Sequence, residues 1–333
     1  MVWLSYISNQ YTKIRKMASS VPSKNDIIAA HERISNYIHR TPIITSSSIN
    51  KIAGAELFFK CESLQKVGAF KARGAINAIL SLSDEELECG VCTHSSGNHA
   101  QALALAAQIV GVNAFIVMPS SAPIVKKNAV LGYGATVIEC EPTLAAREST
   151  VAEIINETGA TLIHPYNDYR IIEGQATAAK ELIEDIEVSL DAILTPVGGG
   201  GLLSGTSLSV KYFSPSTTVY GCEPIGADDA YRSFRDKELY PSVKPNTIAD
   251  GLLTSLGEKP FNIILDNVQD ILTVSDEEIM DALRMTWERM KLVIEPSSAV
   301  CLAAVLKNKD LFKNKSVGII ISGGNVDLSK LNF

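Results

Sequence analysis

Long apolar runs are absent from this chain: no stretch approaches the roughly 20 apolar residues that a membrane-spanning helix needs. Clusters of Lys and Arg are absent too. The 333 residues carry a net charge of −7, so we expect neither a nucleic acid nor an anionic membrane as a partner.

Cysteine is sparse and scattered. The six cysteines follow no disulfide-framework spacing, which indicates a reduced, cytoplasmic compartment. Cys89 and Cys92 form a C-x-x-C, but no second pair accompanies them, so ordinary packing is favoured over metal binding or redox use. Residues 1–24 contain no Asp or Glu, and we expect them to be a disordered extension.

Apolar sequence is abundant, but in short, regular pieces. With 46 % hydrophobic and 20 % charged residues, the chain is long enough for two lobes around a sizeable core. Strand-like runs alternate with helical patterns, which predicts an α/β fold whose mainly parallel sheet is covered by helices. The predicted strands are 57–61, 91–94, 114–118, 136–140, 192–197, 219–223 and 317–322. The predicted helices are 70–82, 100–110, 145–157, 174–186 and 276–291.

Four consecutive glycines lie between the predicted strand 192–197 and Leu202. Backbone without Cβ atoms at the start of a helix can bring several N–H groups close to a phosphate. The run lacks the Lys-Ser/Thr ending of a nucleotide P-loop and the G-x-G-x-x-G spacing of a dinucleotide fold. It therefore favours a small phosphorylated cofactor over ATP or NAD, with a tight strand–helix turn as the ordinary alternative.

Lys71 lies among small and aromatic residues at the start of the predicted helix 70–82. The helix dipole disfavours a cation there, and a desolvated amine has a lowered pKa and becomes a nucleophile toward aldehydes. A nucleophilic amine and a phosphate cradle together describe a site for pyridoxal 5′-phosphate (PLP). A surface helix lysine is the alternative for Lys71 taken alone.

Seven segments, in this order, resemble the serine racemase and serine/threonine dehydratase family of PLP enzymes. They are QKVGAFKARGA (65–75), THSSGNHAQAL (93–103), VGGGGLLSG (197–205), CEPIGADDA (222–230), TIADG (247–251), ERMKLVIEPSSAV (288–300) and SGGNVDL (322–328). Any one alone is a weak signal, whereas the ordered set is highly specific.

The resemblance implies the α/β architecture of fold-type-II PLP enzymes, which is similar to tryptophan synthase β. A large lobe with a parallel twisted sheet is expected at 25–87 and 168–333, and a smaller, mobile, inserted α/β lobe at 88–167. The cofactor is expected in the cleft between them, at the carboxyl ends of strands. A homodimer is also implied.

The resemblance assigns residues to the cofactor. Lys71 would react with its aldehyde, Asn98 would hydrogen-bond its ring hydroxyl, and Ser322 would face its pyridine nitrogen. A neutral hydroxyl at Ser322, rather than a carboxylate, would make the ring a poorer electron sink. The other implied cofactor contacts are Phe70, Gly198, Gly199, Gly200, Gly201, Leu202 and Gly251.

Ser95 and Ser96 leave the predicted strand 91–94 and form an anion-accepting turn suited to a substrate carboxylate. Racemisation needs a proton removed from one face of Cα and returned on the other, so Ser96 is predicted to serve the face opposite Lys71. Helix capping is the ordinary alternative for these serines. The remaining implied substrate contacts are Asn98, His99 and Arg147, although Arg147 also suits a solvated helix face.

Glu223, Ala227 and Asp229 offer two carboxylates and a carbonyl within seven residues, a set of hard ligands for Mg²⁺, Ca²⁺ or Mn²⁺. The spacing of these three residues alone favours an ordinary acidic surface loop. Their match to the cation site of the family, which the resemblance implies, favours a metal site instead. The resemblance also implies ATP as an effector at the subunit interface. Its matching positions are Ser46, Ser47, Lys66, Gln101 and Tyr133, which form no nucleotide motif.

The residues and the resemblance together predict interconversion of L- and D-serine, with elimination of water to pyruvate and ammonia as a side activity. The alternative is an ammonia-lyase acting on serine, threonine or 3-hydroxyaspartate without racemisation. A third hypothesis, without PLP, is a regulatory protein that binds nucleotide phosphates at the glycine run.

Overall fold

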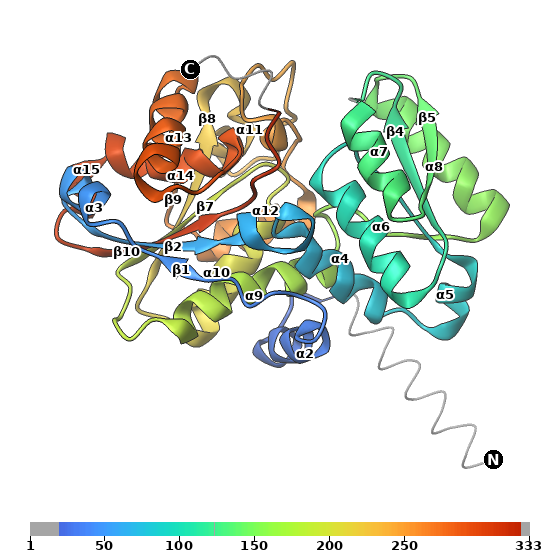
Figure 1. Ribbon diagram of the computed structural model, residues 1–333, viewed down its shortest axis with the longest axis horizontal. Coiled ribbons are helices and arrows are strands. Elements are labelled where there is room, and N and C mark those ends of the chain that lie inside the picture. Colours follow the sequence, from blue (N-terminus) through green and yellow to red (C-terminus); the bar gives the residue numbers. More distant parts are fainter. Residues whose placement is uncertain (1–19, 123, 328–333) are drawn as a thin grey trace, which may run out of the picture.

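A computed structural model describes residues 20–122 and 124–327 of the chain. Residues 1–19 of the expected extension lie outside the described residues. Two sheets, each flanked by helices, lie side by side with α4 (Lys71–Leu80) between them (Figure 1). No helix in the described ranges is both long and apolar enough to traverse a bilayer.

The larger sheet has six strands in the order β1-β2-β10-β7-β8-β9, all parallel except β1. Its strands are β1 (Ile43–Ile44), β2 (Glu56–Cys61), β7 (Ala192–Pro196), β8 (Thr218–Pro224), β9 (Asp270–Val274) and β10 (Ser316–Ile321). The predicted parallel sheet is therefore correct apart from one antiparallel edge strand.

Both faces of this sheet are covered, which explains its continuously apolar strands. Side chains alternate along β10: Ile319 and Ile321 join the core formed with α14 (Pro296–Lys307), whereas Ile320 joins the core formed with α9 and α10. The helices around this sheet are α2 (Lys24–Ile34), α3 (Ser47–Ala53), α9 (Tyr169–Asp185), α10 (Gly201–Phe213), α11 (Asp229–Asp236), α12 (Glu258–Asn267), α13 (Asp276–Met290), α14 and α15 (Lys309–Phe312).

The smaller sheet is wholly parallel, with the order β5-β4-β3-β6. Its strands are β3 (Val91–His94), β4 (Ala114–Pro119), β5 (Thr136–Cys140) and β6 (Thr161–Leu162). Its helices are α5 (Asp84–Cys89), α6 (Asn98–Val110), α7 (Ile124–Gly132) and α8 (Leu144–Thr158).

Each predicted strand and helix is present; β3 and β5 have the predicted ends, and the other elements have shifted ends. The helix predicted at 174–186 begins earlier, at Tyr169, because Asp168 caps it by accepting a hydrogen bond from the Arg170 N–H at 2.9 Å. The strand pattern missed β9 and the two-residue strands β1 and β6. Short 3₁₀ turns at Glu62–Leu64, Lys66–Gly68, Ile225–Ala227 and Asp250–Leu252 complete the described elements.

Candidate active site

The glycine run joins the carboxyl end of β7 to α10, and two of its members, Gly199 and Gly200, have no room for a side chain. A Cβ at Gly199 would lie 2.2 Å from the Tyr166 ring, and one at Gly200 would lie 2.5 Å from Leu256. A Cβ at Gly198 would lie 3.1 Å from the Leu252 backbone. Gly200 also has a φ of 88°, which glycine adopts at little cost.

Several backbone donors at this turn have no acceptor among the described residues. The N–H groups of residues 198–202 donate to no other described residue, and the first intrahelical bond of α10 begins at the Ser204 N–H. Unpaired N–H groups at a helix start need an external acceptor, and phosphate oxygens meet that need. The glycine run therefore fits the phosphate of PLP.

Lys71 begins α4, and its Nζ donates a hydrogen bond of 2.7 Å to the carbonyl of Pro165. Burial lowers the pKa of Lys71 to about 8, so a substantial fraction of the amine is neutral near physiological pH. The preceding residue is tied to the end of β10, because the Phe70 N–H donates to the Ser322 carbonyl at 3.0 Å. The Phe70 ring centroid lies 5.2 Å from Nζ.

The serine turn follows β3 as predicted, but capping does not explain it. The N-cap of α6 is Gly97, and no side chain caps this helix. The Ser95 hydroxyl instead accepts a hydrogen bond from the Gly97 N–H at 3.3 Å. The Ser96 hydroxyl has no hydrogen-bond partner among the described residues. The capping alternative is therefore wrong for both serines.

Asn98 begins α6 and makes contacts that the sequence did not predict. Its Nδ2 donates to both carboxylate oxygens of Glu295, at 3.1 and 3.2 Å, and its Oδ1 accepts from Asn325 at 2.9 Å. Burial, with a further contribution from Asp250, raises the pKa of Glu295 to about 7. Glu295 therefore adds a titratable group beside the predicted cofactor residue Asn98.

The start of α14 organises the end of β10. The hydroxyl groups of Ser298 and Ser322 lie 2.9 Å apart, and the Gly323 N–H donates to Ser298 at 2.7 Å. The hydroxyl of Ser297 accepts from the Gly251 N–H at 3.0 Å. The EPSSA segment (295–299) belongs to one of the motifs that carry the resemblance, but no role was predicted for its residues. The available signal was a run of polar residues ahead of an apolar helix.

His99 follows the serine turn within the first turn of α6, and the charge of Arg147 acts on His94, the residue before that turn. His99 is buried, and its Nε2 lies 3.1 Å from the Ile163 carbonyl oxygen. The Arg147 Nε is buried without a hydrogen-bond partner in the described ranges. Burial and the Arg147 charge together lower the pKa of His94 at the end of β3. A guanidinium with an unpartnered, buried Nε suits an anionic group.

Glu223 and Asp229 are both buried and electrostatically coupled. Burial, followed by the Asp229 charge, raises the pKa of Glu223 well above its usual range, and burial raises that of Asp229 to about 6. One Asp229 oxygen accepts from the Leu256 N–H at 2.8 Å, while Oδ1 has no partner among the described residues. Within the described ranges, no three His, Cys, Asp or Glu side chains form a metal-binding group, so a third protein ligand would be a carbonyl such as that of Ala227. The residues fit a hard cation.

The five positions implied for ATP are not brought together by direct bonds. No hydrogen bond or ion pair among the described residues joins any two of Ser46, Ser47, Lys66, Gln101 and Tyr133. Ser46 instead pairs its hydroxyl with Ser48 at 3.2 Å. Tyr133 packs beside the apolar core of the smaller sheet.

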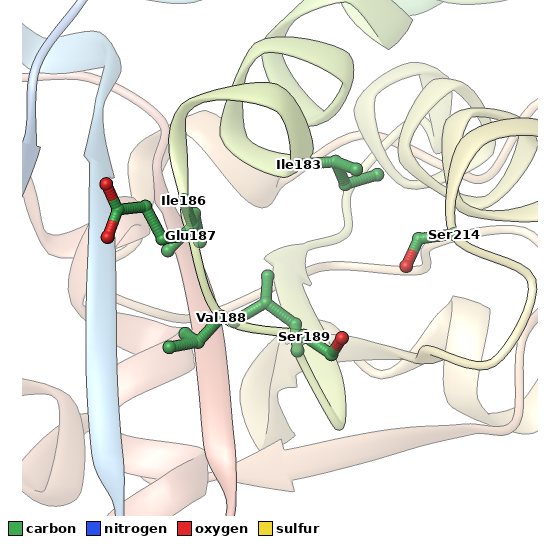
Figure 2. A pocket seen from close by; sticks show the side chains of 7 residues that line it. Ile183, Ile186, Glu187, Val188, Ser189 and Ser214 are labelled. Atoms are coloured by element: carbon green, nitrogen blue, oxygen red, sulfur yellow. The ribbon is translucent and has the colours of Figure 1, made fainter.

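A separate cavity of about 180 Å³ lies where the chain enters β7, at the amino ends of the parallel strands (Figure 2). Its lining residues are Ile183, Ile186, Glu187, Val188, Ser189, Leu190 and Ser214. It contains none of the predicted site residues, and catalytic groups in open parallel sheets gather at the carboxyl ends. This cavity is therefore not the candidate active site.

A buried ion cluster lies beside the site and was also missed. Arg73, two residues after Lys71, contacts Glu62 at 2.7 Å and Glu181 at 2.7 Å, and all three are buried. Lys60 lies 2.7 Å from the same Glu181 carboxylate. The cluster ties α4 to β2 and α9, which fixes the position of the helix that carries Lys71.

Comparisons with known proteins agree with this geometry. Residues 34–323 match the family described as "Pyridoxal-phosphate dependent enzyme". A serine racemase of Dictyostelium discoideum is 55 % identical over 311 residues, covering 92 % of this chain and 96 % of the relative. A beta-hydroxyaspartate dehydratase of Paracoccus denitrificans is 50 % identical over 311 residues, covering 93 % of this chain and 98 % of the relative.

A solved structure matches as well. The crystal structure of serine racemase from Dictyostelium discoideum superimposes with a TM-score of 0.89 at 53 % identity, covering 93 % of this chain and 100 % of that one. The fold-type-II architecture expected from the motifs is thus confirmed. The chain belongs to the pyridoxal-phosphate dependent enzymes, in the branch of the serine racemases and their dehydratase relatives.

Proposed function

We propose that this chain is a PLP-dependent serine racemase with a dehydratase side activity that yields pyruvate and ammonia. The observations that carry the proposal are a buried, low-pKa amine at Lys71 and a Ser96 hydroxyl that has no hydrogen-bond partner among the described residues. Relatives named serine racemase support it at 55 % and 51 % identity.

PLP, when bound, supplies the electron sink that makes the α-proton of an amino acid removable. Lys71 would hold its aldehyde end and the 198–202 backbone its phosphate, while Asn98 and Ser322 would flank the ring. Once the substrate amine has displaced it from the aldehyde, Lys71 would take the proton from one face of Cα, and Ser96 would return a proton on the other. Ser95, His99 and Arg147 would help to hold the substrate near this turn.

Several finer features belong to the proposal. The two separate sheets support a large cofactor domain of residues 25–87 and 168–333 and a mobile domain of residues 88–167. Glu223, Ala227 and Asp229 would hold Mg²⁺, Ca²⁺ or Mn²⁺, which the two coupled buried carboxylates support. We further propose ATP as an effector, a homodimer, and a cytoplasmic location.

The test is an incubation of the PLP-loaded protein with L-serine, followed by chiral chromatography and a keto-acid assay. D-serine together with pyruvate is the expected result. Pyruvate without D-serine would select the ammonia-lyase alternative, which the beta-hydroxyaspartate dehydratase relative favours. L-threonine and 3-hydroxyaspartate would then be compared as substrates. A protein that stays colourless with PLP, with no borohydride-fixed label on Lys71, contradicts both and leaves the nucleotide-binding hypothesis.

A further inference from the structure

The segment between β6 and α9 contacts both predicted ends of the cofactor site. The Pro165 carbonyl receives the hydrogen bond from Lys71 Nζ at 2.7 Å. The next side chain, Tyr166, lies over the glycine run. A Cβ at Gly199 would lie 2.2 Å from its ring, and one at Gly201 would lie 3.1 Å from its Cβ. Adjacent residues of one segment therefore contact the amine and the phosphate cradle.

This segment is held firmly at both ends. The His164 Nδ1 accepts hydrogen bonds from the N–H groups of Tyr166 at 3.3 Å and Asn167 at 2.9 Å. The Asn167 side chain accepts from the Lys259 N–H at 2.9 Å, at the start of α12. The His164 ring meets the Tyr166 ring edge-on, with centroids 4.7 Å apart, and meets His94 at 5.8 Å.

The Tyr166 ring also contacts the far side of the cradle. A Cβ at Gly257 would lie 3.0 Å from the ring, and the Gly257 N–H donates to the Gly199 carbonyl at 3.2 Å. Burial raises the pKa of Tyr166 to about 12. The phenol stays neutral, so the side chain contributes shape rather than charge.

We propose that Tyr166 is a positioning residue that fixes the separation of the Lys71 amine and the glycine run. The inference rests on the proposed function, because PLP carries its aldehyde and its phosphate on neighbouring carbons of one ring, and the short CH2–O link to the phosphate limits how far apart the two groups can be. A site that holds both groups binds tightly only when its own two contacts are preorganised at that separation. The Tyr166 ring also leaves no space for a Cβ at residue 199.

The experiment measures the dissociation constant of PLP by fluorescence titration of cofactor-free protein, together with the melting temperature of that protein. Tyr166→Ala is expected to raise the constant at least about tenfold, whereas Tyr166→Phe, which keeps the ring, stays within about threefold. Tyr212→Ala is the matched control, because this tyrosine contacts Pro22 at 3.0 Å, away from the predicted site residues, and it should leave the constant unchanged.

Gly199→Ala supplies the second measurement. The single variant Gly199→Ala is expected to raise the dissociation constant of PLP more than Tyr166→Ala does, because the new Cβ would clash with the Tyr166 ring. The double variant Gly199→Ala/Tyr166→Ala should bind PLP at least about tenfold more tightly than Gly199→Ala. If Tyr166→Ala does not fold without cofactor, Tyr166→Leu replaces it in both arms.

Two results overturn the inference: a folded Tyr166→Ala protein that binds PLP as tightly as the parent, or a double variant no better than Gly199→Ala. These results leave the proposed function intact, provided that the parent binds PLP. A parent that does not bind PLP overturns both together.

Discussion

Arg73, two residues after Lys71, forms a buried ion pair with Glu181 at a nitrogen–oxygen distance of 2.7 Å. A second Arg73 nitrogen lies 2.8 Å from the other Glu181 oxygen, so the contact is bidentate. Because α4 carries Lys71 at its first turn, this pair holds the site to α9 without contacting the predicted substrate position.

Glu181→Gln is expected to lower the free energy of unfolding by about 3 kcal/mol, because it leaves the buried charges of Arg73 and Lys60 without their shared partner. Chemical denaturation monitored by circular dichroism measures the change. Glu184→Gln is the control, since that carboxylate is 40 % exposed and its pairs with Lys180 and Arg40 should contribute less than about 1 kcal/mol. An equal loss of unfolding free energy in Glu181→Gln and Glu184→Gln would contradict the structural role of the buried ion cluster.

The pKa of Lys71 predicts how the cofactor is captured as pH changes. Burial lowers this pKa to about 8, so protonation below pH 8 withdraws the nucleophilic amine. The rate of colour formation after mixing cofactor-free protein with PLP should rise with pH and level off above about 8, whereas an ordinary lysine would keep gaining neutral amine to about pH 10.4. Stopped-flow absorbance between pH 6 and 9.5 measures the profile. A rate still rising steeply at pH 9.5 would show that the amine is not desolvated.

Ser96→Ala should separate the two proposed reactions. Loss of the hydroxyl removes proton return on one face of Cα, so D-serine formation is expected to fall about 100-fold while pyruvate formation from L-serine changes less than about threefold. Chiral chromatography and a keto-acid assay on the same samples give both rates. Ser95→Ala, its neighbour in the same turn, is expected to change the KM of both reactions and leave their ratio intact. A Ser96→Ala protein that racemises normally would remove Ser96 from the mechanism.

Asp229 and Asp228 are adjacent but have different surroundings. Asp229 is buried with one oxygen that has no partner among the described residues, whereas the Asp228 side chain is 37 % exposed and pairs with Arg232 at 2.9 Å. Adding Mg²⁺ or Ca²⁺ to chelator-treated protein should raise its melting temperature by about 3 °C, since a ligand that binds only the folded state stabilises it. Asp229→Asn should abolish this shift and Asp228→Asn should preserve it. An identical shift in both variants would place the cation elsewhere.

The sequence predicted the elements with strong local patterns. The strands 91–94 and 136–140 have the predicted ends because apolar runs with clear flanking residues need little help from tertiary contacts. The antiparallel strand Ile43–Ile44 was not predicted, because two residues carry no periodicity and are defined only by pairing with Phe59 and Lys60.

The site residues divide in the same way. Lys71 and the glycines were found because each is locally unusual. Tyr166 and Glu295 were not, since their importance comes from partners far along the chain: Pro165 lies 94 residues from Lys71, and Glu295 lies 197 residues from Asn98. The side chain of an isolated tyrosine or glutamate carries no sign of such a neighbour.

Strand β10 lies between β2 and β7, although it follows both by more than a hundred residues. During synthesis on the ribosome, all four strands of the smaller sheet emerge early and can pair at once. In the larger sheet, the edges of β2 and β7 that pair with β10 stay unpaired until β10 has been synthesised, and exposed strand edges are templates for aggregation. We therefore expect nascent chains stalled before residue 316 to depend on chaperones, while their 91–162 portion is already protected from proteolysis.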